Sequence, residues 1–280
     1  MPPAADPIPM TVAYALTCAG SDPSGGAGVQ VDLRTFAALG CWGLSAITAL
    51  TVQTPAAVLD STPVAPGTVR AQVEALADAF PIGAAKTGML ANAAICTAVA
   101  DALPDGVPLV VDPVMAATSG GRLLDPSALA VLVEELLPRA TLVTPNIGEA
   151  SVLAGSPVRT FEEMHDAALR LRDLGAGAVL VTGGHGAEPE AVDLFVDAAG
   201  AFPLRAPRFP YDVHGSGCCL SAAIAARLGQ GADLRAAVRD GKAVVTAAIE
   251  SAVTAPDGRR MANPRPPVVP CGAFPPPGAP

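Results

Sequence analysis

The chain has 280 residues, of which 51% are hydrophobic and 15% charged, and its formal net charge is −9. This composition excludes a chain that is disordered throughout, and the length suffices for one large domain or two modest ones. The 17 Lys and Arg residues are dispersed singly, which disfavours a surface for nucleic acid or for an anionic membrane.

In chain order, short apolar runs alternate with amphipathic segments from about residue 12 to residue 255. The short runs predict strands, and segments whose apolar residues recur about every 3.6 positions predict helices. We predict strands over residues 12–19, 44–50, 56–62, 84–88, 108–113, 140–145, 178–182 and 191–197, and helices over 29–39, 68–80, 93–103, 127–137 and 161–174, with two more after residue 215. This alternation favours an open α/β fold in a single domain, with a mostly parallel sheet covered by helices on both faces.

The chain contains 28 Gly and 29 Pro, and the two residue types are distributed differently. Four prolines fall in the first ten residues and eight in the last seventeen. We therefore predict disordered tails over residues 1–11 and 256–280, outside a domain that spans 12–255. Glycine is instead enriched in the loops that follow strands, which is where sheets of this kind bind ligands.

The six cysteines form no Cys-x-x-Cys pair, and the first ten residues lack the apolar segment of a signal peptide. No stretch of about 18 residues is apolar enough to span a bilayer. The Cys and His residues are too scattered to suggest a zinc site. These features favour a protein of the reducing cytoplasm.

The first predicted strand leads into a glycine-rich loop, residues 19–33, in which several glycines surround Asp22. One interpretation is the turn of a dinucleotide fold, but the spacing is not Gly-x-Gly-x-x-Gly and no acid ends a second strand about 20 residues later. The loop is not a Walker A loop either, because no Gly-Lys-Ser/Thr follows. It remains a candidate ligand loop with an acid at its centre.

The segment from residue 212 to residue 228 is the most informative. Gly215 and Gly217 flank Ser216 directly before a long apolar helix, so backbone N–H groups at the helix N-terminus can converge on an anion. Cys218 falls in the first turn, where a thiol pKa is lowered and a thiolate could accept a proton. The alternative interpretation is a capped helix with a buried cysteine.

Three further strand exits carry polar residues. Asn146 and Glu149 lie three apart at the start of a helix, which suits a hydrated divalent cation but equally suits an Asn N-cap with Glu at the third helical position. Asp112 begins a second exit, and Gly-Gly-His at residues 183–185 forms a third. For His185 and His214, a surface histidine is the ordinary alternative to a role in a site.

Seven blocks together carry a resemblance to known enzymes: AGSDPSGGAGVQVDLRTFAALG, ALTVQ, KTGML, DPVMAATSG, TPNIGEA, GGH and HGSGC. With them the chain resembles, over about residues 13–253, the ribokinase-like superfamily and within it the hydroxymethylpyrimidine/phosphomethylpyrimidine kinases of thiamine biosynthesis. The resemblance implies a three-layer α/β/α sandwich with a mostly parallel central sheet, a small β flap and a homodimer.

The resemblance also implies a substrate pocket and a phosphoryl site. The ring of 4-amino-5-hydroxymethyl-2-methylpyrimidine would lie against Gly20, Asp22, Ala27, Gln53, Met89 and Val114. Gln53 would read the ring, because its amide offers both a donor and an acceptor. The phosphoryl group would lie in an anion hole at Gly215, Ser216 and Gly217, with Cys218 as the catalytic base. Many sugar kinases of the superfamily carry Asp at that last position, which favours a pyrimidine substrate here.

For the nucleotide, the resemblance implies ATP contacts at Asp112, Ser119, Thr182, Gly184 and His185, and Mg²⁺ held through water by Asn146 and Glu149. It leaves open whether K⁺ assists. Three residues depart from the family pattern. Val213 stands where a Thr is often seen before His-Gly. Thr182 stands where the family often has Lys, which removes a cationic contact to phosphates. Ser216 replaces a Thr, a mild change because the anion hole uses backbone N–H groups.

Two alternatives accompany the kinase of hydroxymethylpyrimidine and its monophosphate. The first is a pyridoxal or pyridoxine kinase of the branch with Cys at the base position. The second is a pyrimidine-binding relative without kinase activity, which the Gly-Ser-Gly-Cys and Asn-x-x-Glu motifs disfavour. In each case the partners are small molecules and a second copy of the chain, with neither nucleic acid nor membrane.

Overall fold

The structure is a computed structural model that describes residues 12–116, 123–184 and 190–265. Its main sheet has nine strands in the order β3-β2-β1-β4-β5-β6-β7-β8-β9. Their bounds are β1 Tyr14–Ser21, β2 Trp42–Gln53, β3 Val58–Pro63, β4 Ile82–Thr87, β5 Leu109–Val111, β6 Leu142–Val143, β7 Val179–Val181, β8 Glu190–Asp197 and β9 Gly200–Pro207. Strands β2, β1, β4, β5, β6 and β7 pair in parallel, whereas β3 pairs antiparallel with β2, β8 with β7, and β9 with β8. The predicted open α/β fold is confirmed.

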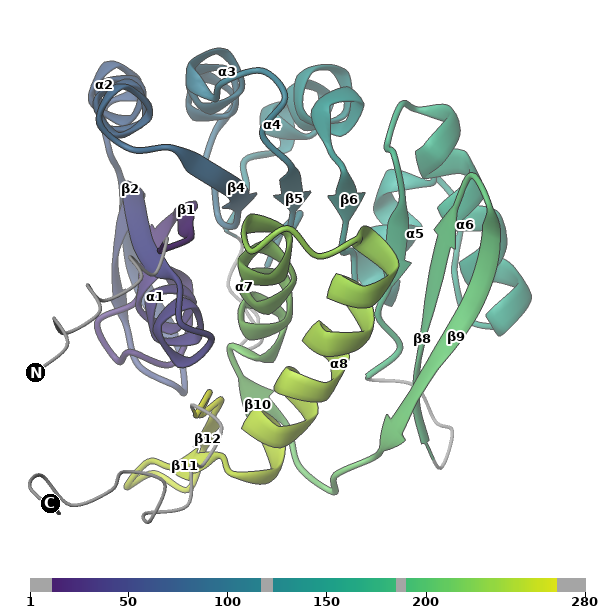
Figure 1. Ribbon diagram of the computed structural model, residues 1–280. Coiled ribbons are helices and arrows are strands. Elements are labelled where there is room, and N and C mark those ends of the chain that lie inside the picture. Colours follow the sequence, from purple (N-terminus) through teal and green to yellow (C-terminus); the bar gives the residue numbers. More distant parts are fainter. Residues whose placement is uncertain (1–11, 117–122, 185–189, 266–280) are drawn as a thin grey trace, which may run out of the picture.

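Helices cover both faces of the sheet (Figure 1). On one face lie α1 Gly28–Ala38, α7 Ser216–Gly229 and α8 Leu234–Glu250, and on the other lie α2 Pro66–Ala79, α3 Ala93–Ala102, α4 Pro126–Val131, α5 Ile147–Leu153 and α6 Phe161–Asp173. Successive strand residues face opposite layers. Val110 packs with the first group of helices, whereas its neighbours Leu109 and Val111 pack with the second. The strands are therefore apolar on both sides, as the short apolar runs predicted.

Two of the differences from the predicted elements involve prolines. Strand β9 was not predicted, because GAFPLRAP carries two prolines; it lies at one end of the sheet order, where prolines are tolerated. The helix predicted over 127–137 is α4 followed by a π turn over Leu132–Leu136 and a 3-10 turn over Leu137–Arg139. Pro138 lies in this last turn, and a proline removes a helical N–H donor.

A small second sheet closes one end of the molecule. It consists of β10 Val213–His214, β12 Arg260–Met261 and β11 Val253–Thr254. The residue after β12, Ala262, is buried, and Asn263 accepts a hydrogen bond of 3.1 Å from Arg34. The fold therefore continues past residue 255, where the sequence analysis places its end. The tail was predicted over 256–280, but residues 256–265 are described and include β12; the predicted tail at 1–11 and the rest of the second one, 266–280, lie outside the described residues.

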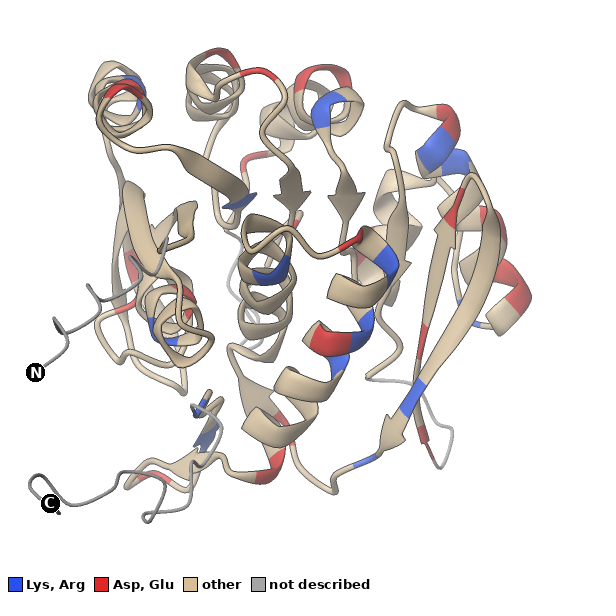
Figure 2. Ribbon diagram, in the orientation of Figure 1, with Lys and Arg blue, Asp and Glu red and all other residues tan. Residues whose placement is uncertain are grey.

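Charged residues of both signs are interspersed over the helices and loops, so no single-sign stripe is visible (Figure 2). In the described part of the chain, no helix has the length and apolar character needed to cross a membrane.

Candidate active site

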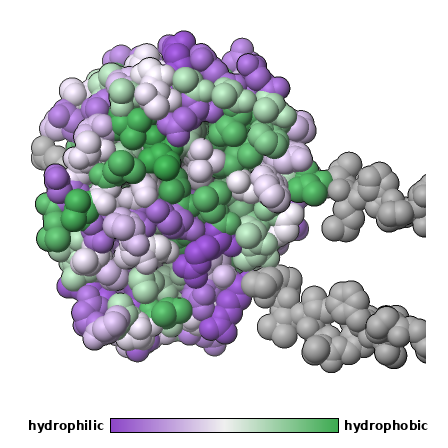
Figure 3. All heavy atoms as spheres, turned by 90° about the vertical axis from the view of Figure 1, so that its left-hand side faces the viewer, coloured by the Kyte–Doolittle hydropathy of each residue, from purple (hydrophilic) through white to green (hydrophobic). Residues whose placement is uncertain are grey.

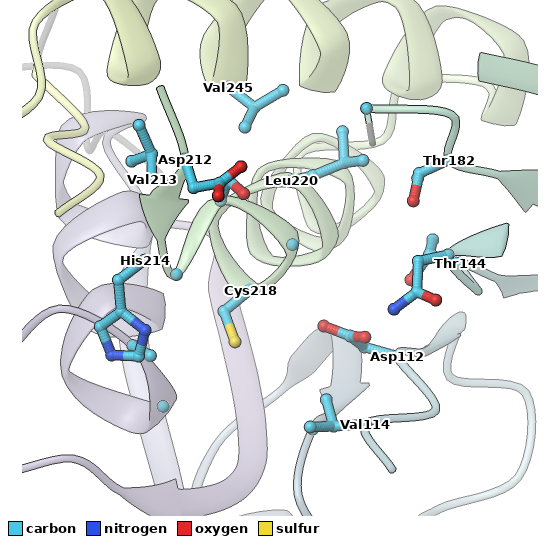
Figure 4. A pocket seen from close by; sticks show the side chains of 18 of the residues that line it. Asp112, Val114, Thr144, Thr182, Asp212, Val213, His214, Cys218, Leu220 and Val245 are labelled. Atoms are coloured by element: carbon cyan, nitrogen blue, oxygen red, sulfur yellow. The ribbon is translucent and has the colours of Figure 1, made fainter. Parts of the chain in front are cut away.

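The carboxyl ends of the parallel strands open into one pocket of about 260 Å³. Because these strands run in the same direction, the loops that follow them meet at a single edge of the sheet. All the predicted site residues that the structure describes line this pocket: Gly20, Asp22, Ala27, Gln53, Met89, Asp112, Val114, Asn146, Glu149, Thr182, Gly184, Gly215, Ser216, Gly217 and Cys218. Ser119 and His185 lie outside the described residues. In Figure 4, Cys218 lies between His214 on one side and Asp112, Thr144 and Thr182 on the other.

Asp22 organises the glycine-rich loop after β1. Its Oδ1 accepts a hydrogen bond from the Ser24 N–H, and its Oδ2 accepts one from the Ala27 N–H, both at 2.9 Å. Burial by itself would raise the pKa of Asp22, but hydrogen bonds from His214 and Ser24 outweigh it and hold the pKa below its usual value. Asp22 is therefore a carboxylate that holds the loop closed around the pocket.

His214, the last residue of β10, reaches into the same loop. Its Nε2 lies 2.9 Å from Asp22 Oδ2 and 3.2 Å from Gln53 Nε2, and its side chain is only 10% exposed. The loops approach so closely that a Cβ atom on Gly215 would lie 1.8 Å from the carbonyl oxygen of Gly26. Gly215 also has a φ of +80°, which favours glycine. The interpretation of His214 as a surface histidine is therefore wrong. In the sequence, the only indication of its contact with Asp22 was that both residues lie in or beside glycine-rich loops.

The anion hole is predicted at the N-terminus of α7. Gly215 is its N-cap, and no side chain caps the helix. The Cys219 N–H donates to the Gly215 carbonyl at 2.9 Å, so the N–H groups of Ser216, Gly217 and Cys218 precede the helical hydrogen-bond ladder. A Cβ atom at Gly217 would meet nothing within 4 Å, which leaves room for a ligand beside these donors.

Cys218 lies between two helix N-termini, because the backbone N–H of Gly28 in α1 also bonds to it. The expectation of a lowered thiol pKa is wrong. Burial raises the pKa of Cys218 to about 12, although Lys86 and the Gly28 N–H act in the opposite direction. Near pH 7 Cys218 is therefore a neutral thiol.

A buried ion cluster beneath Cys218 escaped sequence reasoning. Lys86 of β4 lies 3.1 Å from Asp32 of α1 and 3.9 Å from Asp112. Thr17 Oγ1 donates to Asp32 at 2.7 Å and Ser221 Oγ donates to Asp112 at 3.0 Å. Burial alone would lower the pKa of Lys86, but its acidic neighbours raise it above its usual range, so the residue is a permanent cation. The only signal was a lysine inside an otherwise apolar strand.

Asn146 and Glu149 form both halves of a capping box at the start of α5. Asn146 Oδ1 accepts from the Glu149 N–H, and Glu149 Oε2 accepts from the Asn146 N–H, each at 2.9 Å. The N-cap interpretation is confirmed. Burial, and then the charge of nearby Asp112, raise the pKa of Glu149 to about 8. Thr144 Oγ1, beside them in the pocket lining, is buried and has no hydrogen-bond partner.

The described part of the chain has few side chains placed to bind a metal ion. No group of three His, Cys, Asp or Glu side chains there could hold a metal ion directly. The oxygen donors present near Glu149 nevertheless suit a hard divalent cation that keeps several waters. A cation there would also favour the ionised form of Glu149, which burial and the charge of Asp112 disfavour.

The far end of the pocket contains a cation that sequence reasoning missed. Lys242 of α8 lines the pocket and lies 2.7 Å from Asp193 Oδ2, while Asp193 Oδ1 accepts from the Gly183 N–H at 3.0 Å. Thr182 lines the same end. Thr182 stands where the family often has a lysine, and the pocket lining here has a lysine on another element, Lys242 of α8. No local sequence motif could predict this lysine.

Comparison with known proteins gives consistent matches. The profile of the family described as Phosphomethylpyrimidine kinase matches residues 22–263. A hydroxymethylpyrimidine/phosphomethylpyrimidine kinase of Rhizobium meliloti is 47% identical over 243 residues, covering 86% of this chain and 91% of the relative. A bifunctional thiamine biosynthesis protein of Geobacter sulfurreducens is 44% identical over 85% of this chain and 49% of that protein.

The fold also resembles that of a solved enzyme. The ADP complex of Bacillus subtilis pyridoxal kinase superimposes with a TM-score of 0.83 at 35% sequence identity. The superposition covers 91% of this chain and 98% of that structure.

Proposed function

The chain belongs to the phosphomethylpyrimidine kinase family, and we propose that it transfers the γ-phosphoryl group of ATP to 4-amino-5-hydroxymethyl-2-methylpyrimidine, and then to the resulting monophosphate, for thiamine biosynthesis. One observation carries this proposal: an amide reader, Gln53, and an anion hole at Ser216–Cys218 line the same pocket. A ring held at the first would present its hydroxymethyl group toward the second.

The transfer itself is an in-line displacement. The hydroxymethyl oxygen forms a bond to the γ-phosphorus, the bond from that phosphorus to the bridging oxygen breaks, and ADP leaves. The N–H groups of the anion hole stabilise the charge that spreads over the transferring oxygens. Because the transition state is loose, alignment and charge stabilisation outweigh early deprotonation. Cys218 would take the hydroxyl proton late, after its own thiol proton has left to solvent; Lys86 and the Gly28 N–H favour the thiolate that this requires, whereas burial opposes it.

Mg²⁺ fits the part of the pocket lined by Asn146, Glu149 and Thr144, which would hold it through water. When bound, it would neutralise charge on the nucleotide phosphates. ATP as the phosphoryl donor is supported by family membership and by the ADP complex of the pyridoxal kinase relative. Thr182, Gly184 and Asp112 would contact the nucleotide together with Lys242, which supplies the positive charge that Thr182 lacks.

Phosphorylation of pyridoxal is the second candidate function, because the pyridoxal kinase of Bacillus subtilis shares this fold with a TM-score of 0.83. A coupled ADP-release assay separates the two functions. We expect kcat/KM for hydroxymethylpyrimidine to exceed that for pyridoxal, and we expect its monophosphate to be a second substrate. A higher kcat/KM for pyridoxal would overturn the first assignment. Replacing K⁺ by choline in the same assay tests assistance by K⁺.

We also propose that two copies of the chain associate through the sheet edge at β2 and β3. Strand β3 is the end strand of the sheet, and four apolar side chains on these two strands are exposed: Trp42, Leu50, Val52 and Leu59. Figure 3 shows this side of the molecule, with apolar residues among polar ones. A second copy would cover both the apolar side chains and the open strand edge.

The described cysteines are all free, which fits the reducing cytoplasm that we propose as the location of the enzyme.

A further inference from the structure

The amide of Gln53 has two neighbours that together determine which way it faces. Gln53 Nε2 lies 3.2 Å from His214 Nε2, and Gln53 Oε1 lies 3.2 Å from Thr51 Oγ1. A rotation of 180° about the last side-chain bond exchanges the amide oxygen and nitrogen, so the hydrogen-bond network must decide between the two orientations.

The His214 contact decides it on one side. His214 Nε2 lies 2.9 Å from the Asp22 carboxylate, which can only accept, so Nε2 carries a hydrogen whether the imidazole is neutral or charged. An N–H group of Gln53 pointed at this N–H would place two donors face to face. The atom of Gln53 nearest to His214 must therefore be the acceptor, Oε1.

The Thr51 contact favours the same orientation on the other side. Thr51 has one hydroxyl hydrogen, and its Oγ1 lies 2.8 Å from the Ser21 carbonyl oxygen, an acceptor that takes this hydrogen. Thr51 then has only lone pairs to offer Gln53, so the group facing it must be the donor, Nε2. Both neighbours favour the same orientation.

We propose that the His214–Asp22 pair locks Gln53 with Oε1 toward His214 and Nε2 toward Thr51, and that this lock sets which ring edge the pocket accepts. The inference rests on the proposed function, in which Gln53 reads the pyrimidine. A locked amide presents its remaining acceptor and donor in one order only. An aminopyrimidine, with its exocyclic amino donor beside a ring-nitrogen acceptor, matches that order. The corresponding 4-oxo ring, with a carbonyl acceptor beside a ring N–H, presents the reverse. His214 is thus a positioning residue for specificity.

The test compares two substrates, hydroxymethylpyrimidine and its 4-oxo analogue, in wild type and in a matched pair of variants. In wild type we expect kcat/KM to favour the amino ring by at least about 10³, because the wrong ring leaves buried polar groups unpaired. His214→Leu keeps the bulk but removes the N–H. Gln53 can then turn, because the Thr51 hydroxyl can rotate its one hydrogen from the Ser21 carbonyl to Gln53 Oε1, and the ratio should fall by at least about 30-fold. His214→Gln keeps an N–H donor near the position of Nε2 and should retain most of the ratio.

Three results would overturn the proposal: an unchanged ratio in His214→Leu, an equal fall in both variants, or a His214 Nε2 without a proton. Two-bond ¹H–¹⁵N spectra of the resting protein, with the His214 signal assigned from His214→Gln, report that proton without any turnover. Gln53→Leu separates this proposal from the one on which it rests. If Gln53→Leu abolishes the preference and His214→Leu does not, only the lock is wrong. If Gln53→Leu leaves the preference intact, the ring reader is wrong, and the lock with it.

Discussion

Lys86 Nζ lies 3.1 Å from Asp32 Oδ2, and neither side chain is exposed to solvent. This pair joins β4 to α1, and its second acidic neighbour, Asp112, begins the loop after β5. A cation is therefore fixed beneath the anion hole by elements from three parts of the chain.

Lys86→Met should lower the free energy of unfolding by about 3–5 kcal/mol, because it leaves the buried carboxylate of Asp32 without its counterion. Urea denaturation measures this difference. Adding Asp32→Asn to Lys86→Met should recover part of the loss, since no unpaired charge then remains while the amide oxygen can still accept from Thr17.

Arg205→Met is the matched control, because Arg205 also pairs with a carboxylate at 3.1 Å, that of Glu190, but both side chains are more than half exposed. It should cost less than about 1 kcal/mol. An equal loss in Lys86→Met and Arg205→Met would contradict the account of the buried cluster.

Cys218 should react slowly with iodoacetamide in the resting enzyme. Because burial raises its pKa to about 12, only about one molecule in 10⁵ carries the thiolate at pH 7. The folded thiol gains thiolate as pH rises toward that pKa, so the rate should increase about tenfold per pH unit from pH 7 to pH 10. A rate that levels off near pH 8.5, as for an ordinary thiol, would show that the site lowers the pKa after all.

The reactivity is best followed at the Cys218 peptide by mass spectrometry in a Cys271→Ser background, with the buried Cys219 as an internal reference. In the same background Cys218→Ala should lower kcat by about 10² to 10⁴ for both phosphorylation steps. Full kcat in Cys218→Ala would remove Cys218 from the role of base.

Gly217→Asp should abolish turnover, because it places a carboxylate beside the N–H groups that we propose hold the transferring phosphoryl oxygens. Gly217→Asn is the matched control: it has nearly the same size without the charge. Since a Cβ atom at Gly217 meets nothing within 4 Å, both variants should unfold at nearly the wild-type urea concentration.

Steady-state kinetics with ATP and hydroxymethylpyrimidine should show a loss of at least about 10³ in kcat for Gly217→Asp and a clearly smaller loss for Gly217→Asn. Equal losses would mean that bulk, not charge, is what the anion hole excludes.

The sequence predicted the architecture well because its signals are local. Apolar runs of strand length and helical periodicity lie within single elements, and the helix start at Gly215 is visible in a few consecutive residues. A parallel sheet places the loops after its strands at one edge, so the position of the candidate residues could be predicted once the strands were. The described candidates all line one pocket for this reason. Strand β9 was missed because its prolines contradict the usual strand pattern, which only an edge position permits.

What the sequence did not predict depends on pairs far apart in the chain. His214 meets Asp22 across 192 positions, and Lys86 meets Asp32 across 54. The pKa of Cys218 was predicted in the wrong direction for the same reason. Its place in a helix first turn is local, whereas the burial that outweighs the helix N-terminus comes from the assembled fold.

Leu59→Glu should convert the proposed dimer to a monomer, because it places a charge on the end strand, in the apolar face that a second copy would cover. Leu59 is 70% exposed, so the substitution should leave the monomer fold intact. Sedimentation velocity should show the wild type as a dimer and Leu59→Glu as a monomer at the same concentration. Leu169→Glu is the control, since Leu169 is exposed on α6, far along the sheet order from β3. A monomeric wild type would refute the interface.

Glu149→Gln should raise the Mg²⁺ concentration needed for half-maximal activity by at least about tenfold, because glutamine keeps the shape of the side chain but cannot become the carboxylate that a bound cation would favour at Glu149. The glutamine oxygen can still accept from the Asn146 N–H, so the capping box survives and urea stability should not fall. Glutamine also cannot take on the carboxylate charge that burial and Asp112 disfavour at Glu149. Glu74→Gln, at an exposed position on α2, is the control and should leave the Mg²⁺ dependence unchanged. If Glu149→Gln likewise leaves it unchanged, Glu149 acts only as a helix cap, and the cation must be held by the nucleotide and other residues.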